Sequence, residues 1–191
     1  YGTIMALTLL ALGLPPAVVG ASVNLAEIVT CGASGLAHAW YRNVDWRLVA
    51  RLAPAGVIGA ILGAATLSKI DGAILRPMLP VYLAALGVYI LWRAFKACGS
   101  RATTDDRVVI PLGLVGGALS ATGGGWGPIV TSTLVGRGHA PRYTIGSVNL
   151  CQTFVAIAAS ATYVAFIGID HWPTVAALVA GGLLAAPFGG Y

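Results

Sequence analysis

Apolar residues fill the chain in long stretches, which short polar or Pro/Gly segments interrupt. The stretches cover about residues 3–13, 17–39, 48–67, 74–95, 108–121, 126–135, 143–167 and 173–190. A helix needs ~20 apolar residues to cross a hydrocarbon core of ~30 Å. The second, third, fourth, seventh and eighth stretches therefore predict membrane spans, whereas the fifth and sixth are too short to be ordinary spans.

The composition supports this prediction. The chain has 58% hydrophobic and only 9% charged residues, whereas soluble domains carry about 25% charged residues. Aromatic residues flank the apolar stretches, where interfacial rings are common, at Trp40, Tyr41, Trp46, Trp92 and Trp172. The net charge of +5 is not clustered on a soluble face as nucleic-acid binding requires. We therefore expect an all-α integral membrane protein with no nucleic-acid partner.

The sequence repeats itself at an offset of about 125 positions, because residues 20–27 (GASVNLAE) correspond to residues 145–152 (IGSVNLCQ). Gly13 corresponds likewise to Gly138, and Pro16 to Pro141. This predicts a first repeat over 1–97, a connector over 98–107 and a second repeat over 108–191. Tyr1 aligns with Trp126, so we expect the first repeat to be incomplete at its N-terminus, the second at its C-terminus, and the chain to be a fragment.

The basic loops predict that the two repeats have opposite topology. Residues 40–51 and 93–107 are rich in Arg and Lys and are expected on the cytoplasmic side. In the second half the basic loop is 136–142, whereas 168–172, the equivalent of 43–46, has no Lys or Arg. Equivalent loops then face opposite sides. This is the inverted-topology repeat that is common among secondary transporters.

A glycine-rich segment, Thr122-Gly123-Gly124-Gly125, separates two short apolar stretches. Each glycine costs a helix up to ~1 kcal/mol, so we expect a broken or re-entrant segment that is buried in protein or lines a wet cavity. A helix beginning near Gly127-Pro128 would offer free N–H groups and its positive dipole end to an anion. The alternative is that the glycines only allow close helix packing.

The duplicated Ser-Val-Asn-Leu tetrapeptide supplies further candidate donors. Ser22 and Asn24 lie about two turns into one predicted span, and Ser147 and Asn149 occupy the equivalent places in another. Their hydroxyl and amide groups can donate to an anion without fixed charge, which permits release. The alternative is hydrogen bonding between helices, worth ~1 kcal/mol per contact.

Glu27 is a carboxylate deep in a predicted span, where a charge costs ~2.5–3.5 kcal/mol on insertion scales. We consider it a candidate for proton coupling; its equivalent, Gln152, cannot titrate. A neutral, hydrogen-bonded Glu27 is the alternative. The histidines His38, His139 and His171 lie at loop edges, where we expect interface residues rather than proton relays.

An enzyme is not expected. Residues 32–35 (GASG) resemble the GxSG nucleophile pattern of rhomboid proteases, but serine catalysis needs a base within hydrogen-bond reach. His38 lies near the end of the same predicted helix and the other histidines lie in loops, and four small residues are ordinary in a membrane helix. The cysteines Cys31, Cys98 and Cys151 lack the spacing of a zinc site or a disulfide framework. No metal or other cofactor is expected.

Taken together, the ordered motifs at 20–27, 33–35, 43–47, 123–125 and 145–149 resemble the TauE/SafE family of bacterial sulfite and organosulfonate exporters, over essentially the whole chain. The resemblance implies a multi-pass permease of the bacterial inner membrane that exports small anions, coupled to a proton or other ion gradient. With two inverted repeats, we expect it to work by alternating access. A homodimer is a further expectation. A passive anion channel and a non-transporting membrane scaffold are the alternatives.

Overall fold

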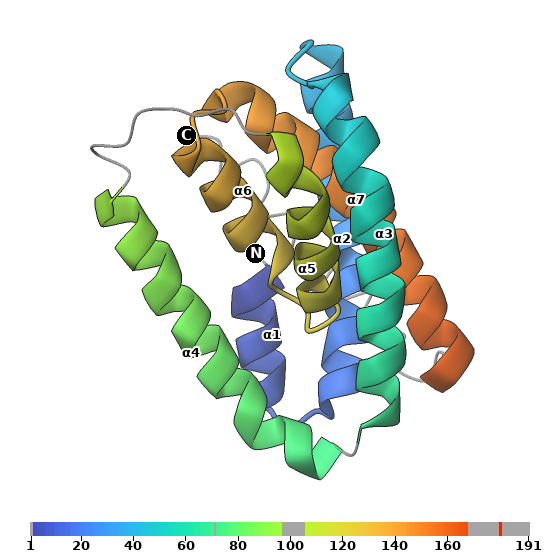
Figure 1. The fold of residues 1–191 in the computed structure, drawn as a ribbon. Coiled ribbons are helices and arrows are strands. Elements are labelled where there is room, and N and C mark those ends of the chain that lie inside the picture. The colour runs from blue at the N-terminus through green and yellow to red at the C-terminus, as the bar shows by residue number, and fades with distance from the viewer. Residues whose placement is uncertain (1, 71, 97–105, 168–179, 181–191) are drawn as a thin grey trace.

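The computed structural model describes residues 2–70, 72–96, 106–167 and 180, and every element within these ranges is helical (Figure 1). A short 3₁₀ turn, η2 (Asp106–Val108), precedes the fifth helix. The helices are α1 (Gly2–Ala11), α2 (Pro16–Trp40), α3 (Trp46–Lys69), α4 (Gly72–Lys96), α5 (Val109–Ser120), α6 (Trp126–Gly136) and α7 (Pro141–Ile167). They match the first seven predicted stretches; the eighth, 173–190, lies outside the described residues apart from Ala180.

Four helices are long and apolar enough to cross a membrane. These candidate spans are Pro16–Trp40, Trp46–Lys69, Gly72–Tyr89 and Pro141–Phe166. Helices α1, α5 and α6 have 10, 12 and 11 residues, so at 1.5 Å per residue they extend only ~15–18 Å, about half of the hydrocarbon core. The expected all-α membrane fold is confirmed at this level.

The short helices α5 and α6 form a hairpin at the glycine-rich segment. In Figure 1 the two helices run in opposite directions from residues 121–125, so the chain turns back instead of continuing across. Two side chains satisfy carbonyl groups at the end of α5: Asn24 Nδ2 donates to the Ser120 oxygen at 3.1 Å, and the Tyr163 hydroxyl donates to the Ala121 oxygen at 2.7 Å. The irregular backbone is therefore held inside protein, as a membrane environment requires.

The turns that end α1 and α6 have the same geometry. Gly13 (φ 85°) and Gly138 (φ 95°) both adopt the left-handed conformation that glycine enters at little cost. In each turn the residue after the glycine donates to the carbonyl five positions back at 3.2 Å, Leu14 to Leu9 and His139 to Leu134. The two turns lie at opposite ends of the molecule in Figure 1.

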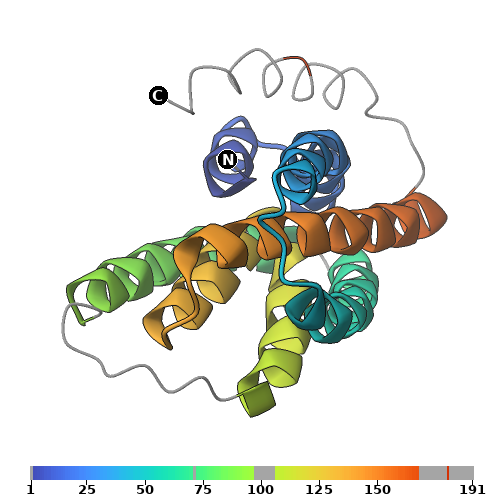
Figure 2. The same ribbon diagram turned by 90° about the horizontal axis from the view of Figure 1, so that it is seen from above.

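Helices α2 and α7 pack along each other, and α3 packs against both α5 and α7 (Figure 2). Glycines make the contact between α3 and α5 close, since a Cβ added at Gly59 would overlap the Leu114 carbonyl oxygen and one added at Gly117 would overlap that of Gly56. Small residues at helix contacts are the usual means of close approach in membranes.

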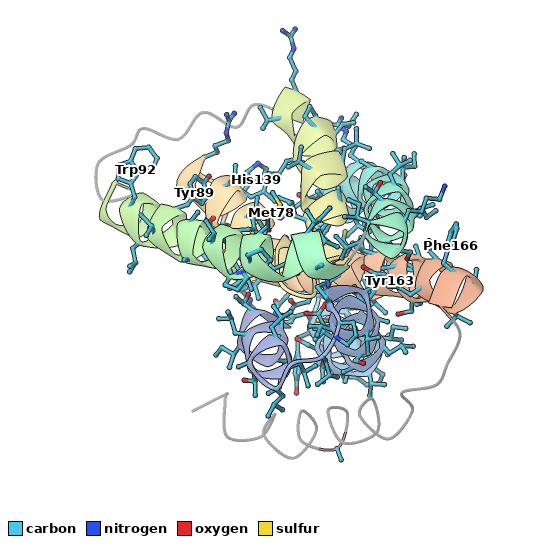
Figure 3. All side chains as sticks on the ribbon, turned by 90° about the horizontal axis from the view of Figure 1, so that it is seen from below. Met78, Tyr89, Trp92, His139, Tyr163 and Phe166 are labelled. Atoms are coloured by element: carbon cyan, nitrogen blue, oxygen red, sulfur yellow. The ribbon has the colours of Figure 1, made fainter. Side chains whose placement is uncertain are left out.

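Large apolar side chains face outward around the molecule (Figure 3). Met78, Trp92 and Phe166, all labelled there, have more than half of their surface exposed. The interior is in contrast well filled: Trp126 is 2% exposed, and its indole Nε1 donates to the Val148 carbonyl oxygen at 3.2 Å. An apolar exterior of this kind is matched to lipid as the solvent.

The two basic loops, 41–45 after α2 and 137–140 after α6, lie together at one end of the molecule. Arg142 Nε donates to Asn43 Oδ1 at 2.6 Å, and the Asp45 amide donates to Ser147 Oγ at 2.8 Å. The Asp45 side chain also caps α3, because its Oδ1 accepts from the Arg47 amide at 2.9 Å. The loops that the positive-inside pattern assigns to one side of the membrane are thus neighbours.

Candidate functional site

The starts of α1 and α6 border a single cavity. In Figure 1 the two half-length helices run away from each other from this region, α1 in one direction and α6 in the other. The cavity has a volume of about 180 Å³ and its lining comes from four helices and the glycine-rich segment: Gly2, Thr3, Glu27, Cys31, Gly124, Trp126, Gly127, Pro128, Asn149 and Gln152. The dipole of α6 therefore directs its positive end at this space.

Backbone donors at the α6 start are available to a ligand. Within the described chain, no hydrogen-bond partner is found for the amides of Gly124, Gly125, Trp126 and Gly127. Pro128 has no N–H, and the first intrahelical bond is that of the Ile129 amide to the Gly125 carbonyl oxygen at 3.4 Å. Unsatisfied amides at a helix start form an anion-binding site of the usual kind.

The glycines of the site differ in whether crowding or backbone conformation requires a glycine at their position. A Cβ added at Gly124 would lie 2.7 Å from the Cα atom of Thr3, and one added at Gly125 would lie 2.6 Å from the Tyr82 hydroxyl. Gly123 has φ 88° and so requires a left-handed backbone. Gly127 is neither crowded nor left-handed, because an added Cβ there would have no atom within 4 Å. Packing therefore does not account for the glycine at position 127.

Glu27 and Gln152 meet at the inner wall of the cavity. Gln152 Nε2 donates to Glu27 Oε2 and also to Ser120 Oγ, the latter at 3.2 Å. Gln152 Oε1 is buried and has no partner in the part of the chain that the structure describes. The lining has Glu27 as its one carboxyl group, and no Lys, Arg or His. Any anion bound here would be held by dipoles and neutral donors.

The structure places the candidate residues in different surroundings. Asn149 and Gly124 line the cavity, and Asn149 Nδ2 donates to Ser34 Oγ at 2.9 Å. Asn24 is fully buried and bonds to backbone carbonyls. Ser147 Oγ accepts from the Asp45 amide, and Ser22 is buried outside the cavity lining. The two Ser-Val-Asn-Leu segments thus contribute Asn149 alone to this cavity.

Thr122 belongs to the hairpin rather than to the cavity lining. Its Oγ1 donates to the Leu119 carbonyl oxygen at 2.7 Å, which closes the end of α5. Gln152, Cys31 and Trp126 line the cavity but were not among the candidates. Gln152 could have been chosen as a site candidate from the sequence, because the repeat aligns it with the candidate Glu27.

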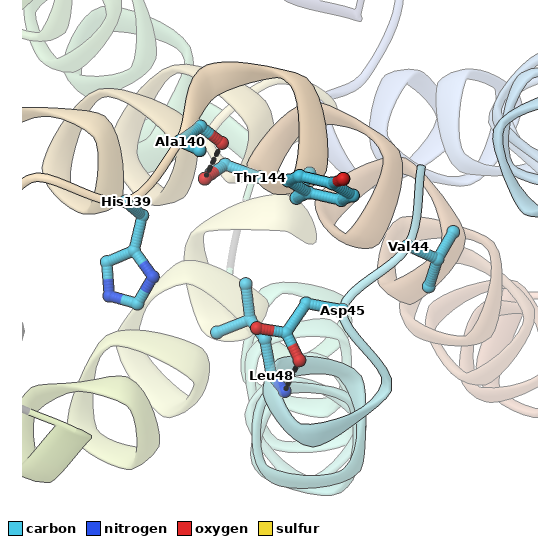
Figure 4. A pocket seen from close by; sticks show the side chains of 7 residues that line it. Val44, Asp45, Leu48, His139, Ala140 and Thr144 are labelled. Carbon is cyan, nitrogen blue, oxygen red and sulfur yellow. Dashed lines mark hydrogen bonds between the residues drawn. The ribbon is translucent and has the colours of Figure 1, made fainter. Parts of the chain in front are cut away.

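A larger cavity of about 350 Å³ lies between the two basic loops (Figure 4). Its lining includes Asp45, His139, Tyr143 and Thr144. The Asp45 carboxylate is already engaged in capping α3, and Thr144 Oγ1 donates to the Ala140 carbonyl oxygen at 2.9 Å. Because Asp45 and Thr144 serve local structure and this cavity is remote from the glycine-rich segment, we place the functional site in the smaller cavity.

The described residues hold no group of three or more His, Cys, Asp or Glu side chains that could bind a metal. Cys31 and Cys151 are free thiols, and Cys98 and His171 lie outside the described residues. His38 is on α2 and His139 is in the loop before α7, half-buried in both cases.

Apolar spanning helices, a buried break between half-length helices and a small polar cavity at their starts define a multi-pass membrane protein of the transporter class. Residues 2–191 match the family described as "Sulfite exporter TauE/SafE", and the chain belongs to this family. The chain is also 40% identical, over 196 aligned positions, to a Bacillus subtilis (strain 168) protein named "Probable membrane transporter protein YtnM". The match covers 98% of the chain but 65% of that relative's length. No solved structure matches.

Proposed function

We propose that the protein carries small anions, such as sulfite or organosulfonates, across the bacterial inner membrane, and that the cavity between α1 and α6 is its substrate site. The observation that carries this proposal is that the half-length helix α6 starts, with free backbone amides, at a cavity whose described lining has no basic side chain. The family description supports a sulfur oxyanion as substrate and export as the direction.

The donor set suits a carrier, which must release its substrate as well as bind it. Each helix start contributes up to ~2 kcal/mol to anion binding in partly buried geometry, and backbone amides with the Asn149 amide add neutral hydrogen bonds. A buried Lys or Arg would hold an anion more strongly, because removing one partner of a buried ion pair is costly. A helix start that acts with neutral donors supports binding that is moderate and reversible.

Glu27 is the group through which a proton gradient would act on the anion. It is 7% exposed and lines the same cavity that holds the proposed anion site. An ionised Glu27 repels an anion in the cavity, and protonation removes that repulsion. The affinity of the cavity for an anion therefore depends on whether Glu27 carries a proton.

Alternating access is supported by the relation between the two halves. Helices α2 and α7 run in opposite directions in Figure 1, the equivalent turns at Gly13 and Gly138 lie at opposite ends, and Glu27 contacts its own equivalent, Gln152. These features fit two inverted repeats, 1–97 and 108–191 about a connector at 98–107, that rock about the shared cavity. A homodimer of such subunits is part of the proposal.

The test is flux of labelled sulfite into proteoliposomes that contain the full-length protein, with and without a pH gradient. We expect saturable uptake that the gradient accelerates, and exchange that unlabelled sulfite on the opposite side stimulates. The Glu27→Gln variant is expected to retain exchange and lose the response to the gradient. Flux that does not saturate and shows no exchange would indicate a channel, and absence of flux for sulfite, sulfonates and carboxylates would indicate a scaffold.

A further inference from the structure

Glu27 and its repeat equivalent Gln152 have different surroundings in the cavity wall. The carboxyl group of Glu27 lies against Gly2, because a Cβ added at Gly2 would overlap Glu27 Oε1. The protein's own side chain therefore already fills the space beside Gly2 that a diffusible anion would take.

At α6 the equivalent place is open. Gly127, the repeat equivalent of Gly2, has no atom within 4 Å of an added Cβ. The residue equivalent to Glu27 is Gln152, which is neutral and forms its hydrogen bonds with Glu27 and Ser120. The described residues thus place a carboxylate against the start of α1 and none against the start of α6.

A buried acceptor in the same wall lacks a partner. Gln152 is 4% exposed, lines the cavity and leaves Oε1 without a hydrogen bond in the described structure. A buried polar group in this condition loses its hydration without gaining a hydrogen bond, and a ligand in the cavity can supply that hydrogen bond. A singly charged oxyanion that keeps one proton, as hydrogen sulfite does, supplies oxygens for the α6 amides and a hydroxyl for Gln152.

From these observations we infer that the anion binds at the start of α6 alone, where the neutral Gln152 leaves room for it, while Glu27 acts as a tethered anion beside Gly2. This inference rests on the proposed anion-carrier function and assigns the substrate's place within it. The inference also gives a function to the difference between Glu27 and Gln152. Glu27 fills the space beside Gly2, whereas Gln152 leaves the space beside Gly127 open. Singly charged oxyanions follow as the preferred class, because Glu27 opposes a second negative charge.

The test is equilibrium binding of sulfite to the full-length protein in nanodiscs at neutral pH, for wild type, Gln152→Glu, Gln152→Met and Glu27→Gln. A carboxylate at position 152 is expected to act as a tethered anion at α6 and to weaken binding at least about tenfold. The neutral Gln152→Met variant, of similar length, is expected to weaken it about threefold or less. Glu27→Gln is expected to tighten binding, because it discharges the anion at α1.

Equal sulfite affinity of Gln152→Glu and Gln152→Met would overturn the inference, as would weaker binding by Glu27→Gln. If Gln152→Glu does not fold, the isosteric Glu27→Gln variant decides alone, since unchanged or weaker binding contradicts a tethered anion. Failure of the proposed function looks different: the wild type itself would then bind no sulfite.

Discussion

Gln152 donates a hydrogen bond to Glu27, and these two residues stand 125 positions apart, at the offset of the sequence repeat. In the proposed arrangement of two inverted halves, a residue that contacts its own equivalent lies where the halves meet, and this pair lies beside the cavity at the α6 start. A carboxyl group at such a junction is well placed to influence both halves at once.

The opposite placement of the two equivalent turns predicts opposite sides for residues 12 and 137. In a variant without Cys31, Cys98 and Cys151, single cysteines at Leu12 and Arg137 should react with a membrane-impermeant maleimide from opposite sides of the membrane. Leu12 is 72% exposed, so its replacement leaves packing unchanged. Labelling of both positions from the same side would contradict the inverted arrangement.

The equivalent residues Asn24 and Asn149 should respond differently to alanine substitution. Asn24 donates to the Gly20 and Ser120 carbonyl oxygens in the interior, so Asn24→Ala removes two buried hydrogen bonds and should lower the free energy of unfolding by about 1–3 kcal/mol. Asn149→Ala, at the cavity wall, should reduce sulfite flux more than stability. Thermal unfolding in detergent and proteoliposome flux separate the two effects, and equal loss of stability in both variants would contradict the assignment.

The α3–α5 contact should tolerate no added side chain. Gly117→Ala would force a Cβ into the Gly56 carbonyl group, and we expect a cost of about 1–3 kcal/mol from overpacking. Gly87→Ala is the matched control, because an added Cβ at Gly87 has no atom within 4 Å. The melting temperature should fall for the first variant and stay constant or rise for the second.

Backbone strain, and not crowding, should make substitution of the turn glycine Gly13 destabilising. Gly13 has φ 85° and no atom within 4 Å of an added Cβ, so Gly13→Ala would be destabilising through its left-handed conformation alone, by about 1–2 kcal/mol. Chemical denaturation of the variant in detergent measures this cost. A Gly13→Ala variant as stable as wild type would show that the turn relaxes without penalty.

The helices could be predicted from the sequence because a segment that crosses lipid must be a long apolar helix. Apolar stretches end where polar or Pro/Gly residues begin, and α3, for instance, begins directly after the capping residue Asp45. The hairpin at 121–125 could be anticipated on the same basis, since three glycines within an apolar sequence exclude a continuous span.

The surroundings of individual site residues could not be predicted in the same way. Ser147 and Ser22 are alike in sequence, but Ser147 Oγ is used by the Asp45 amide, a partner 102 positions away. Gln152 lines the cavity because α7 packs along α2, which a local pattern does not encode. Contacts between distant segments decide which of several equivalent donors reaches the cavity.

The most direct test of the account is the sulfite affinity of Gly127→Ala in the full-length protein. The added methyl group meets no atom of the described structure and is placed at the cavity wall, and alanine favours a helix over glycine by about 1 kcal/mol. The account predicts a variant that is at least as stable as wild type but binds sulfite at least about fivefold more weakly, a loss of roughly 1 kcal/mol. Gly87→Ala should bind as wild type does. Sulfite affinity within about twofold of wild type for Gly127→Ala would contradict an anion site at the start of α6.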